Sequence, residues 1–435
     1  MPDSSPQPGA HARLIPMPLG LVVCYGLLFA AMLVFWSAYI AHQPDLLGYA
    51  YRTDFLGVYV GAHSVASGHG GQLYDLEVQR SEMNQAVLPY HRAPLMAFIY
   101  PAYVAVLLGP LGFLPFVQAV VVMLITNCLI AMRIAWVLGT RFSESSRERL
   151  TLLFAFLGFV PLHLTLLQNQ LGLFPALGIL EAALALKDRK PVKAGLWLLL
   201  GILKPQLILF PLLALVLWQC WKALVPFVLG CAAVFAVSLS IAGWWVPDYL
   251  SFLRAYNRAG SQMSLYPQAM HNWRGLACVL FQMAHPAASR ALIVALTLVS
   301  ILATVILCRY LGCDARPDTG SEAWEPRFAL VVLLGILSSP HLYLHDWVVF
   351  VPAAVFLQRW ARSLDWANGS GSRRAFFWLL AGSPFVFTFS HFIGWSPGGL
   401  IQWVPWYMGA FVCVGIFLLK AAESKSPAEL AATTA

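Results

Sequence analysis

The stretch MPLGLVVCYGLLFAAMLVFWSAYIA (17–41) decides the fold class of this chain. It contains no charged residue, and about 20 apolar residues are enough for a helix to cross the roughly 30 Å of hydrocarbon in a bilayer. The run is too long for the core of a signal peptide, and no clear small-x-small cleavage site precedes the polar loop that follows. We therefore predict a retained helix that anchors the chain in a membrane.

Composition extends this prediction to the whole chain. The 435 residues are 60% hydrophobic and 11% charged, with 16 Trp and 27 Phe, and the mean hydropathy is +0.72. We expect an all-α polytopic bundle of about 11–13 spans over 17–420, without a separate soluble domain. The candidate spans are 17–41, 94–113, 115–139, 150–167, 171–187, 192–203, 205–219, 223–243, 290–311, 328–340, 347–358, 374–392 and 400–420.

Basic residues mark the loops on one side of the expected bundle. They occur in RFSESSRER (141–149), in KDRKPVK (187–193) and between 359 and 374. The positive-inside rule places such loops in the cytoplasm, so topology accounts for the net charge of +8. The loops 42–93 and 244–275 then lie on the opposite side, where we expect interfacial helices.

The two chain ends and one pair of spans complete this topology. The segments 1–16 and 421–435 are small and polar, and we expect disordered cytoplasmic tails. A conflict arises at 94–113 and 115–139, because two full crossings there would put the basic loop 141–149 on the wrong side. Either one of these runs is re-entrant or the charge rule fails locally.

The chain lacks the motifs of nucleotide-dependent and metal-dependent chemistry. No P-loop, GxSxG, HExxH or GxGxxG in context is present. The eight Cys lie mostly inside apolar runs, without the spacing of a metal site. Asp54 and Asp75 lack the clustered carboxylates that Mg²⁺ favours, and no basic-aromatic platform points to nucleic acid. We expect neither a metal nor another cofactor.

Asp54 is the polar residue that most needs an explanation. It stands in YRTDFLGVYVGAHSVASGHGGQLYD (51–75), directly after the first apolar run. A carboxylate at the edge of a membrane suits general-base chemistry on a lipid-borne substrate. Alternatively, Asp54 caps a helix that begins at Phe55. Position alone does not choose between these roles.

Lys204 is the second such residue. It stands among apolar residues in GILKPQLILF (201–210), and an ammonium at the centre of a membrane helix costs about 2.5–3.5 kcal/mol. Pro205 predicts a helix break beside it, and the N-terminus of the next run, 205–219, also attracts negative charge. A phosphate ligand fits both features, whereas snorkelling to the interface is the alternative.

Further polar residues collect on the non-cytoplasmic side of the expected bundle. Candidates for binding a phosphate or a sugar are Tyr100, Gln170, Arg258, His271, Arg274, His345 and Asp346. Each has an ordinary alternative, because interfacial Arg is common, an amide often joins two helices, and a His at a helix end is often only a cap. His345 and Asp346 are adjacent and would not face each other on a helix, so we expect each to have other partners.

Several of these segments together resemble glycosyltransferase family 87. The segments are DFLGVYVGAHSVASGHGGQLYD (54–75), Tyr100-Pro101 with PLGFLP (110–115), LLQNQLGLFPAL (166–177), AGLWLLLGILKPQ (194–206) and SSPHLYLHDW (338–347). The family consists of polytopic GT-C-fold enzymes, among them bacterial α-mannosyltransferases that use polyprenyl-phosphate-mannose. The resemblance covers 17–420, and its 54–75 stretch and Lys-Pro element are the most specific parts.

The resemblance implies an inverting glycosyltransferase of the cell envelope, set in the bacterial inner membrane with its site facing the periplasm or exterior. Asp54 would be the catalytic base that deprotonates the acceptor hydroxyl. Lys204 would lie at the donor phosphate, and His345 and Asp346 would line the same cavity. The partners would be membrane lipids, a glycan or glycolipid acceptor, and a polyprenyl-phosphate hexose with mannose as the expected sugar.

The chain departs from the family pattern in three places, and alternatives to this function stay open. The usual Gly-Gln is NQ (169–170), the usual Tyr-Pro-Pro is YPA (100–102), and the usual Asn-Gln-Ser region reads HNWR (271–274). A transporter or flippase would show repeat symmetry, and no convincing repeat is present. An assembly subunit would tolerate loss of Asp54, and a glycan ligase or polymerase would depend more on the Arg and His residues of 244–275.

Overall fold

The structure, a computed structural model, describes residues 17–90, 94–281, 285–310, 316–317, 322–364, 371–393 and 403–423. Within these ranges all regular secondary structure is helical, which confirms the all-α polytopic bundle expected from composition. The expected tail 1–16 and residues 424–435 of the expected tail 421–435 lie outside the described residues.

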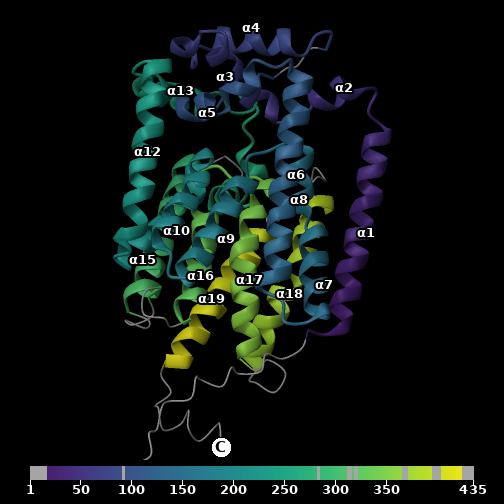
Figure 1. Ribbon diagram of the computed structural model, residues 1–435, viewed down its shortest axis with the longest axis vertical. Helices are drawn as coiled ribbons and strands as arrows, with labels where there is room; N and C mark the ends of the chain where they lie inside the picture. The colour runs from purple at the N-terminus through teal and green to yellow at the C-terminus, as the bar shows by residue number, and fades with distance from the viewer. Residues whose placement is uncertain are drawn as a thin grey trace, which may run out of the picture.

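Short helices lie across the upper end of the molecule in Figure 1. They are α2 (Leu46–Ala50), α3 (Phe55–Ala66), α4 (Leu76–Ala86), α5 (Ala102–Gly112) and α13 (Val246–Ala259). Their apolar side chains, among them Phe55 and Phe252, form a core together with Phe98, which precedes α5, and with Val120 of the bundle. Residues 42–90 and 244–263 therefore form a helical layer on the bundle.

Glycines of the DFLGVYVGA motif hold α3 against this layer. Gly57 and Gly61 are four residues apart and share one face of the helix. A Cβ on Gly57 would lie 2.9 Å from the carbonyl oxygen of Ala97, and a Cβ on Gly61 would overlap the ring of Phe98. Their missing side chains let the segment before α5 pack directly on α3, which keeps the N-terminal end of α3 in place.

Beneath this layer the rest of the chain forms a bundle, whose long helices run between the two ends (Figure 1). Its core includes Trp347, Phe350 and Phe387. The helices are α1 (Leu19–Ala41), α6 (Phe116–Arg141), α7 (Ser146–Leu157), α8 (Val160–Leu167), α9 (Leu173–Lys187), α10 (Pro191–Leu198), α11 (Leu209–Leu217), α12 (Trp221–Ala242), α14 (Trp273–Leu280), α15 (Pro286–Arg309), α16 (Trp324–Ser338), α17 (Phe350–Ser363), α18 (Gly371–Ile393) and α19 (Trp403–Glu423).

By length and composition, five helices of the described residues can cross a membrane: α1, α6, α12, α15 and α19. The pair α7 and α8 adds a sixth if it is one span, bent by 47°. This is fewer than the 11–13 spans expected, because most of the other apolar runs form shorter helices. Of these, α9 and α16 have 15 residues each and are buried almost throughout.

The conflict at 94–113 and 115–139 is resolved by α5. This helix has 11 residues, which span about 17 Å and cannot cross a bilayer. It packs along α3 in the upper layer, and a Cβ on Gly112 would overlap the backbone of Ala62. A single crossing by α6 therefore separates the upper layer from the basic loop 141–149.

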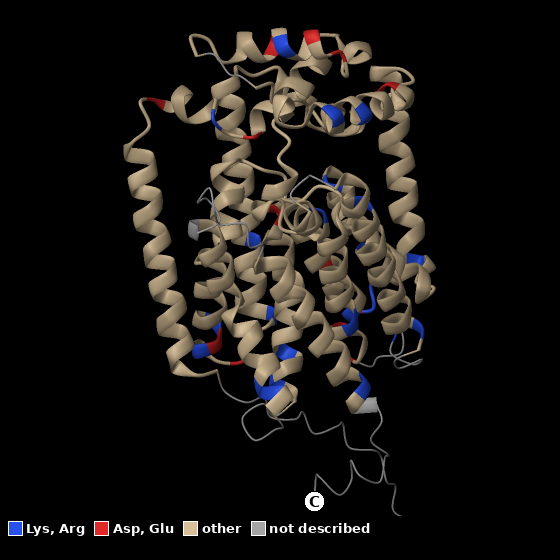
Figure 2. Cartoon of the chain, turned by 180° about the vertical axis from the view of Figure 1, so that it is seen from behind, with Lys and Arg blue, Asp and Glu red and all other residues tan. Residues whose placement is uncertain are grey.

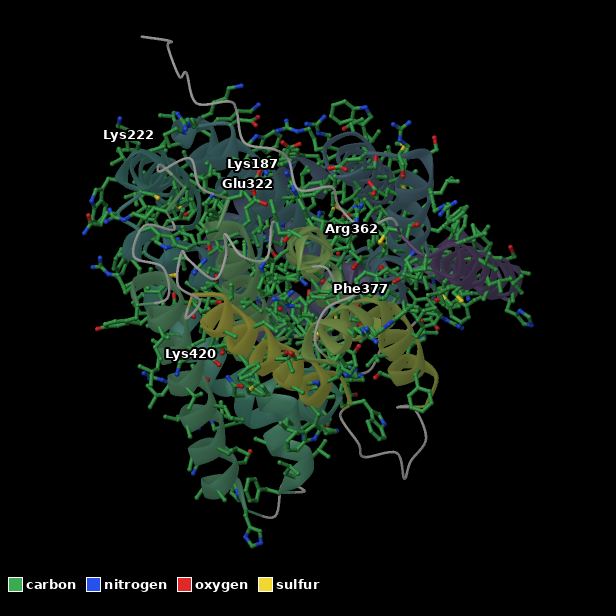
Figure 3. All side chains as sticks on the ribbon, turned by 90° about the horizontal axis from the view of Figure 1, so that it is seen from below. Lys187, Lys222, Glu322, Arg362, Phe377 and Lys420 are labelled. Atoms are coloured by element: carbon green, nitrogen blue, oxygen red, sulfur yellow. The ribbon has the colours of Figure 1, made fainter. Side chains whose placement is uncertain are left out.

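Basic residues gather at the lower end of the bundle (Figure 2), which carries the loops 141–149 and 187–193. Figure 3, seen from below, places Lys187 beside Glu322, and the two form an ion pair of 2.8 Å. Lys187 also lies 2.5 Å from buried Glu325, and Arg362 pairs with Glu148. Many charges of this end are thus neutralised within the protein.

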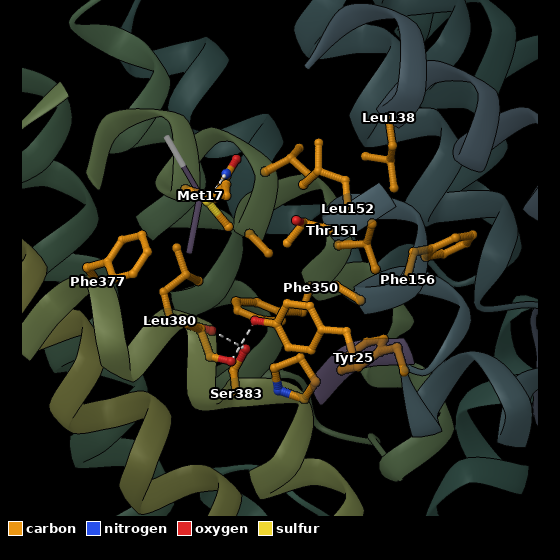
Figure 4. A pocket seen from close by; sticks show the side chains of 18 residues that line it. Met17, Tyr25, Leu138, Thr151, Leu152, Phe156, Phe350, Phe377, Leu380 and Ser383 are labelled. Carbon is orange, nitrogen blue, oxygen red and sulfur yellow. Dashed lines mark hydrogen bonds between the residues drawn. The ribbon is translucent and has the colours of Figure 1, made fainter. Parts of the chain in front are cut away.

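An apolar cavity lies between α1, α7, α17 and α18 (Figure 4). None of the site residues predicted from the sequence lines it. The ring of Phe350 lines the cavity and packs on Trp347 at 6.2 Å between centroids, and Trp347 follows Asp346 directly in the chain. Aromatic side chains therefore stand between this cavity and the polar residues of the next section.

Candidate functional site

The loop between α8 and α9 brings Gln168, Asn169 and Gln170 into the protein interior. Asn169 has a φ of 52° just after α8 ends, in the left-handed conformation that closes many helices and that Gly or Asn adopts at least cost. This explains how Asn can stand where the family pattern has Gly. Its side chain accepts from Asn127 at 3.1 Å and donates to the Val120 carbonyl at 2.7 Å, which ties the loop to α6.

Asp54 stands at the N-terminus of α3 but does not cap it. No side-chain hydrogen bond closes the first turn of α3, whereas Asp45 and Asp75 accept from backbone N–H groups of α2 and α4. The Oδ2 atom of Asp54 accepts instead from Nε2 of Gln170 at 2.8 Å. Its backbone N–H donates to Oε1 of Gln168 at 3.2 Å. The capping alternative is therefore not the role of this side chain.

Lys204 lies at a break in the helix, as its neighbour Pro205 predicts. The 3₁₀ turn η2 (Leu199–Leu203) ends before it and η3 (Pro205–Leu207) begins after it. The residue is only 2% exposed, so the side chain does not snorkel. Its Nζ donates to Oε1 of Gln170 at 2.8 Å and to Oδ1 of Asp346. A buried carboxylate therefore balances the ammonium.

Asp346 belongs to the 3₁₀ turn η6 (Leu344–Val349). Its Oδ2 atom accepts from the backbone N–H of Tyr343 at 3.3 Å, and Nε2 of His345 lies 3.5 Å from the same oxygen. The adjacent side chains of His345 and Asp346 therefore do approach each other, contrary to the expectation from the sequence. Thr165 of α8 donates to the carbonyl of His345 at 2.8 Å and joins η6 to the α8–α9 segment.

These contacts join Asp54, Gln170, Lys204 and Asp346 into one hydrogen-bonded series, which we name the polar chain. Its members come from the start of α3, the α8–α9 loop, the η2–η3 break and η6. Gln170, Lys204 and Asp346 are 8%, 2% and 0% exposed. The polar chain holds two carboxylates and one ammonium, and because Lys204 is paired with Asp346, the unbalanced negative charge lies at Asp54.

Three tyrosines lie close enough to Asp54 to interact with its charge. They are Tyr100, Tyr256 and Tyr343, and burial is the main reason that the pKa of each phenol is raised, to about 12 for Tyr343. Neutral phenols can both donate and accept hydrogen bonds, and their ring faces are apolar. The surroundings of Asp54 therefore suit a ligand that is rich in hydroxyl groups.

Arg274, at the start of α14, lies near two of these tyrosines. Its Nη1 donates to the carbonyl of Pro340 and its Nη2 to Oδ1 of Asn257, each at 3.0 Å. Its charge also acts on Tyr256 and Tyr343. Arg258, in contrast, is exposed on α13, and its Nε donates to the carbonyl of Arg254, one turn earlier in the same helix. The structure therefore does not bring Arg258 to the polar chain.

Three histidines lie in or near the site and are neutral. Burial lowers the pKa of His345, and lowers the pKa of His341 to about 3 and of His271 to about 4. The backbone N–H of His271 donates to the carbonyl of Leu342, and its carbonyl accepts from Trp347. His271 thus ties loop 244–275 to the segment before η6, without direct contact with the polar chain among the bonds described.

Four further residues shape the site, and two of them, Asn127 and Tyr256, were missed by sequence reasoning. Gln168 and Asn127 position Asp54 and the α8–α9 loop, and Tyr256 and Tyr343 stand near Asp54. A signal existed for Asn127, because it interrupts the long apolar run of α6. Tyr256 lies on the buried face of the amphipathic helix α13, a position that predicts burial but no specific partner.

Within the described ranges, no group of three or more His, Cys, Asp or Glu side chains is placed to hold a metal ion. That observation does not test whether the reaction uses a metal or another cofactor. The metal-free site therefore stays a prediction.

Comparison with known proteins places the chain in a family. The model of glycosyltransferase family 87 matches residues 98–340, more than half of the chain. This match includes Gln170 and Lys204, whereas Asp54 precedes it and Asp346 follows it. No curated protein and no solved structure matches the chain, so the expected GT-C architecture stays a prediction.

Proposed function

The chain belongs to glycosyltransferase family 87 and is a multi-pass membrane glycosyltransferase, and on this premise we propose that it transfers a hexose from a polyprenyl-phosphate donor with inversion. The acceptor is a glycan or a glycolipid, and mannose is the proposed sugar. The observation that carries the proposal is the state of Asp54: its carboxylate lies at a helix start without capping it, and among the described residues only the neutral amide of Gln170 is bonded to its Oδ2.

Asp54 acts as the general base in this proposal. An acceptor hydroxyl donates to Oδ1, which has no hydrogen-bond partner among the described residues. The hydroxyl oxygen then forms a bond to the anomeric carbon as its proton passes to Asp54. The bond between that carbon and the phosphate oxygen breaks on the opposite face, and its electron pair leaves with the polyprenyl phosphate. One base and one departing phosphate balance the step, as inverting transfer requires.

The leaving phosphate needs positive charge, which Lys204 and Arg274 supply. An ammonium has three donors, and two of those of Lys204 are used by Gln170 and Asp346. The third remains for a phosphate oxygen. Neutral His345 and the tyrosines around Asp54 would hold the sugar hydroxyls.

The lower end of the bundle faces the cytoplasm in this proposal. Its basic loops support that orientation through the positive-inside rule, and the upper layer with Asp54 then faces the periplasm or exterior of a bacterial inner membrane. A polyprenyl-phosphate sugar would reach the upper end from the bilayer. A glycan ligase or polymerase, which would depend on the Arg and His residues of 244–275, stays the alternative; of these residues, Arg258 does not join the site.

The test is Asp54→Asn in membranes supplied with labelled polyprenyl-phosphate-mannose and, separately, polyprenyl-phosphate-glucose. We expect transfer from the preferred donor to fall by about 10²–10⁴-fold, because the amide cannot take the proton. The matched control is Asp75→Asn, which changes an acid of the same layer that serves as a cap. Equal transfer by the Asp54 variant and the control would refute the proposed base.

A further inference from the structure

We infer that Gln170 is a positioning residue, oriented by Lys204 so that its N–H₂ group faces Asp54 and holds one oxygen of that carboxylate. This inference rests on the proposed function, because it explains how the proposed base is presented. It also changes the role expected from the sequence, in which Gln170 binds a sugar hydroxyl.

The orientation of the amide follows from hydrogen-bond chemistry. The Lys204 ammonium can only donate, so the atom of Gln170 that lies 2.8 Å from Nζ must be the amide oxygen. The other end of the amide is then the N–H₂ group, and it meets Oδ2 of Asp54 at 2.8 Å. An ionised carboxylate only accepts. The two charged neighbours therefore select one of the two possible amide orientations.

Lys204 can impose this orientation because it is itself held from the other side. Asp346 accepts from Lys204 through Oδ1, and from the backbone N–H of Tyr343 through Oδ2. The direction of each hydrogen bond is thus set along the whole polar chain, from the peptide N–H of Tyr343, just before η6, to Asp54. Lys204 and Asp346 are almost fully buried, so water has little access to replace either partner.

The two oxygens of Asp54 therefore have different roles. Oδ2 accepts the hydrogen bond from Gln170 at 2.8 Å. The same bond restricts rotation of the carboxylate and leaves Oδ1 for the acceptor hydroxyl. An amide in the opposite orientation would place two acceptors face to face and push Asp54 toward the protonated, inactive form.

Gln170→Glu separates positioning from simple structural support. The new carboxylate still accepts from Lys204, so that bond survives, but it cannot donate to Asp54 once ionised. Two acids then face each other, and like charges raise the pH at which such a pair loses its proton. We expect the acid limb of the pH–rate profile to move up by about one pH unit or more. We also expect kcat to fall at least about tenfold, with a smaller change in the KM for labelled polyprenyl-phosphate-mannose.

Other titratable groups near Asp54 must be distinguished from it. Those whose charges act on or with Asp54 are Tyr100, Tyr256, Tyr343 and His345, with Lys204 and Asp346 behind Gln170. Infrared titration of the purified protein in detergent distinguishes the titration of Asp54 from that of these neighbours, and it needs no substrate. The carboxyl band that disappears in Asp54→Asn is assigned to Asp54, and its titration is then followed in Gln170→Glu.

A second variant keeps the inference testable if Gln170→Glu folds poorly. Gln170→Met has a similar length and bonds neither neighbour, so it should lower kcat without adding a charge. Its acid limb should move less than that of Gln170→Glu. The inference is wrong if both variants keep the wild-type titration of the Asp54 infrared band and the wild-type acid limb of the pH–rate profile.

The two proposals fail in different ways. Full transfer by Asp54→Asn would reject the proposed base, whatever Gln170 does to the titration. Loss of transfer in Asp54→Asn together with a wild-type pH profile in Gln170→Glu would keep the base and reject the positioning role.

Discussion

The polar chain near the upper end and the ion pairs at the lower end differ in how they partner charged side chains inside an apolar protein. At the lower end two buried acids each meet a cation: Glu148 pairs with Arg362, and Glu325 with Lys187. In the polar chain Lys204 pairs with Asp346, but Asp54 is bonded to a neutral amide.

This difference shows where structure alone does not account for the charge. Asp54 is half-buried, and a partly desolvated carboxylate without a cation costs stability, so a protein that only needed stability would pair it or replace it. The lower pairs can be explained by packing and topology. Asp54 requires another reason, and the proposed proton transfer provides one. Changing one member of each region tests this difference.

The largest expected effect comes from removing the ion pair of the polar chain. Lys204→Met alone should lower the free energy of unfolding by about 3–5 kcal/mol, because Asp346 is left buried without its cation. The double variant Lys204→Met with Asp346→Leu should recover most of that stability. It should not recover transfer, which we expect to stay at least about 100-fold below wild type.

The measurements are thermal unfolding in detergent and transfer per folded molecule. Near-normal transfer by the double variant would show that the pair serves only the fold.

Glu148→Ala makes the matching change at the lower end. The loss of its pair with buried Arg362 should also cost about 3–5 kcal/mol of unfolding free energy. Because this site is remote from Asp54 in the bundle, transfer per folded molecule should stay within about twofold of wild type, within the scatter of unrelated sites. A loss of transfer as large as that of the polar-chain variant would erase the distinction between the two regions.

A smaller effect is expected from pH, and it should be specific to the upper end. The pKa of His341 is about 3 in the folded protein, lowered mainly by burial, against about 6.5 when unfolded. Its contribution to stability is therefore complete above pH 6.5 and is lost as the pH falls toward 3. His341→Asn should lose less stability than wild type between about pH 7.5 and pH 5.

The unfolding midpoints of the two proteins at both pH values test this. Identical losses would mean that His341 is not held neutral in the folded state.

Single residues show how far the sequence could lead to the site. Lys204, Gln170 and Asp54 could be nominated because each is a polar group in or beside an apolar run, and the penalty for such a group is local. Arg258 was nominated in the same way, as a charged residue in the loop 244–275. It stays on the exposed face of α13, since an interfacial helix can keep Arg in contact with water. Tyr256 gave no signal, because a buried aromatic is ordinary in such a helix.

Composition and the lengths of its apolar runs determined that this chain is an all-helical membrane protein, since solvation by lipid depends on local sequence. The family motifs determined that it is a glycosyltransferase. Only the tertiary structure decided that α5 lies across the bundle, that Asp54 does not cap α3, and that Lys204 pairs with Asp346, 142 positions away. Those outcomes depend on how distant helices pack, because a buried charge is stabilised only by the partner that folding brings to it.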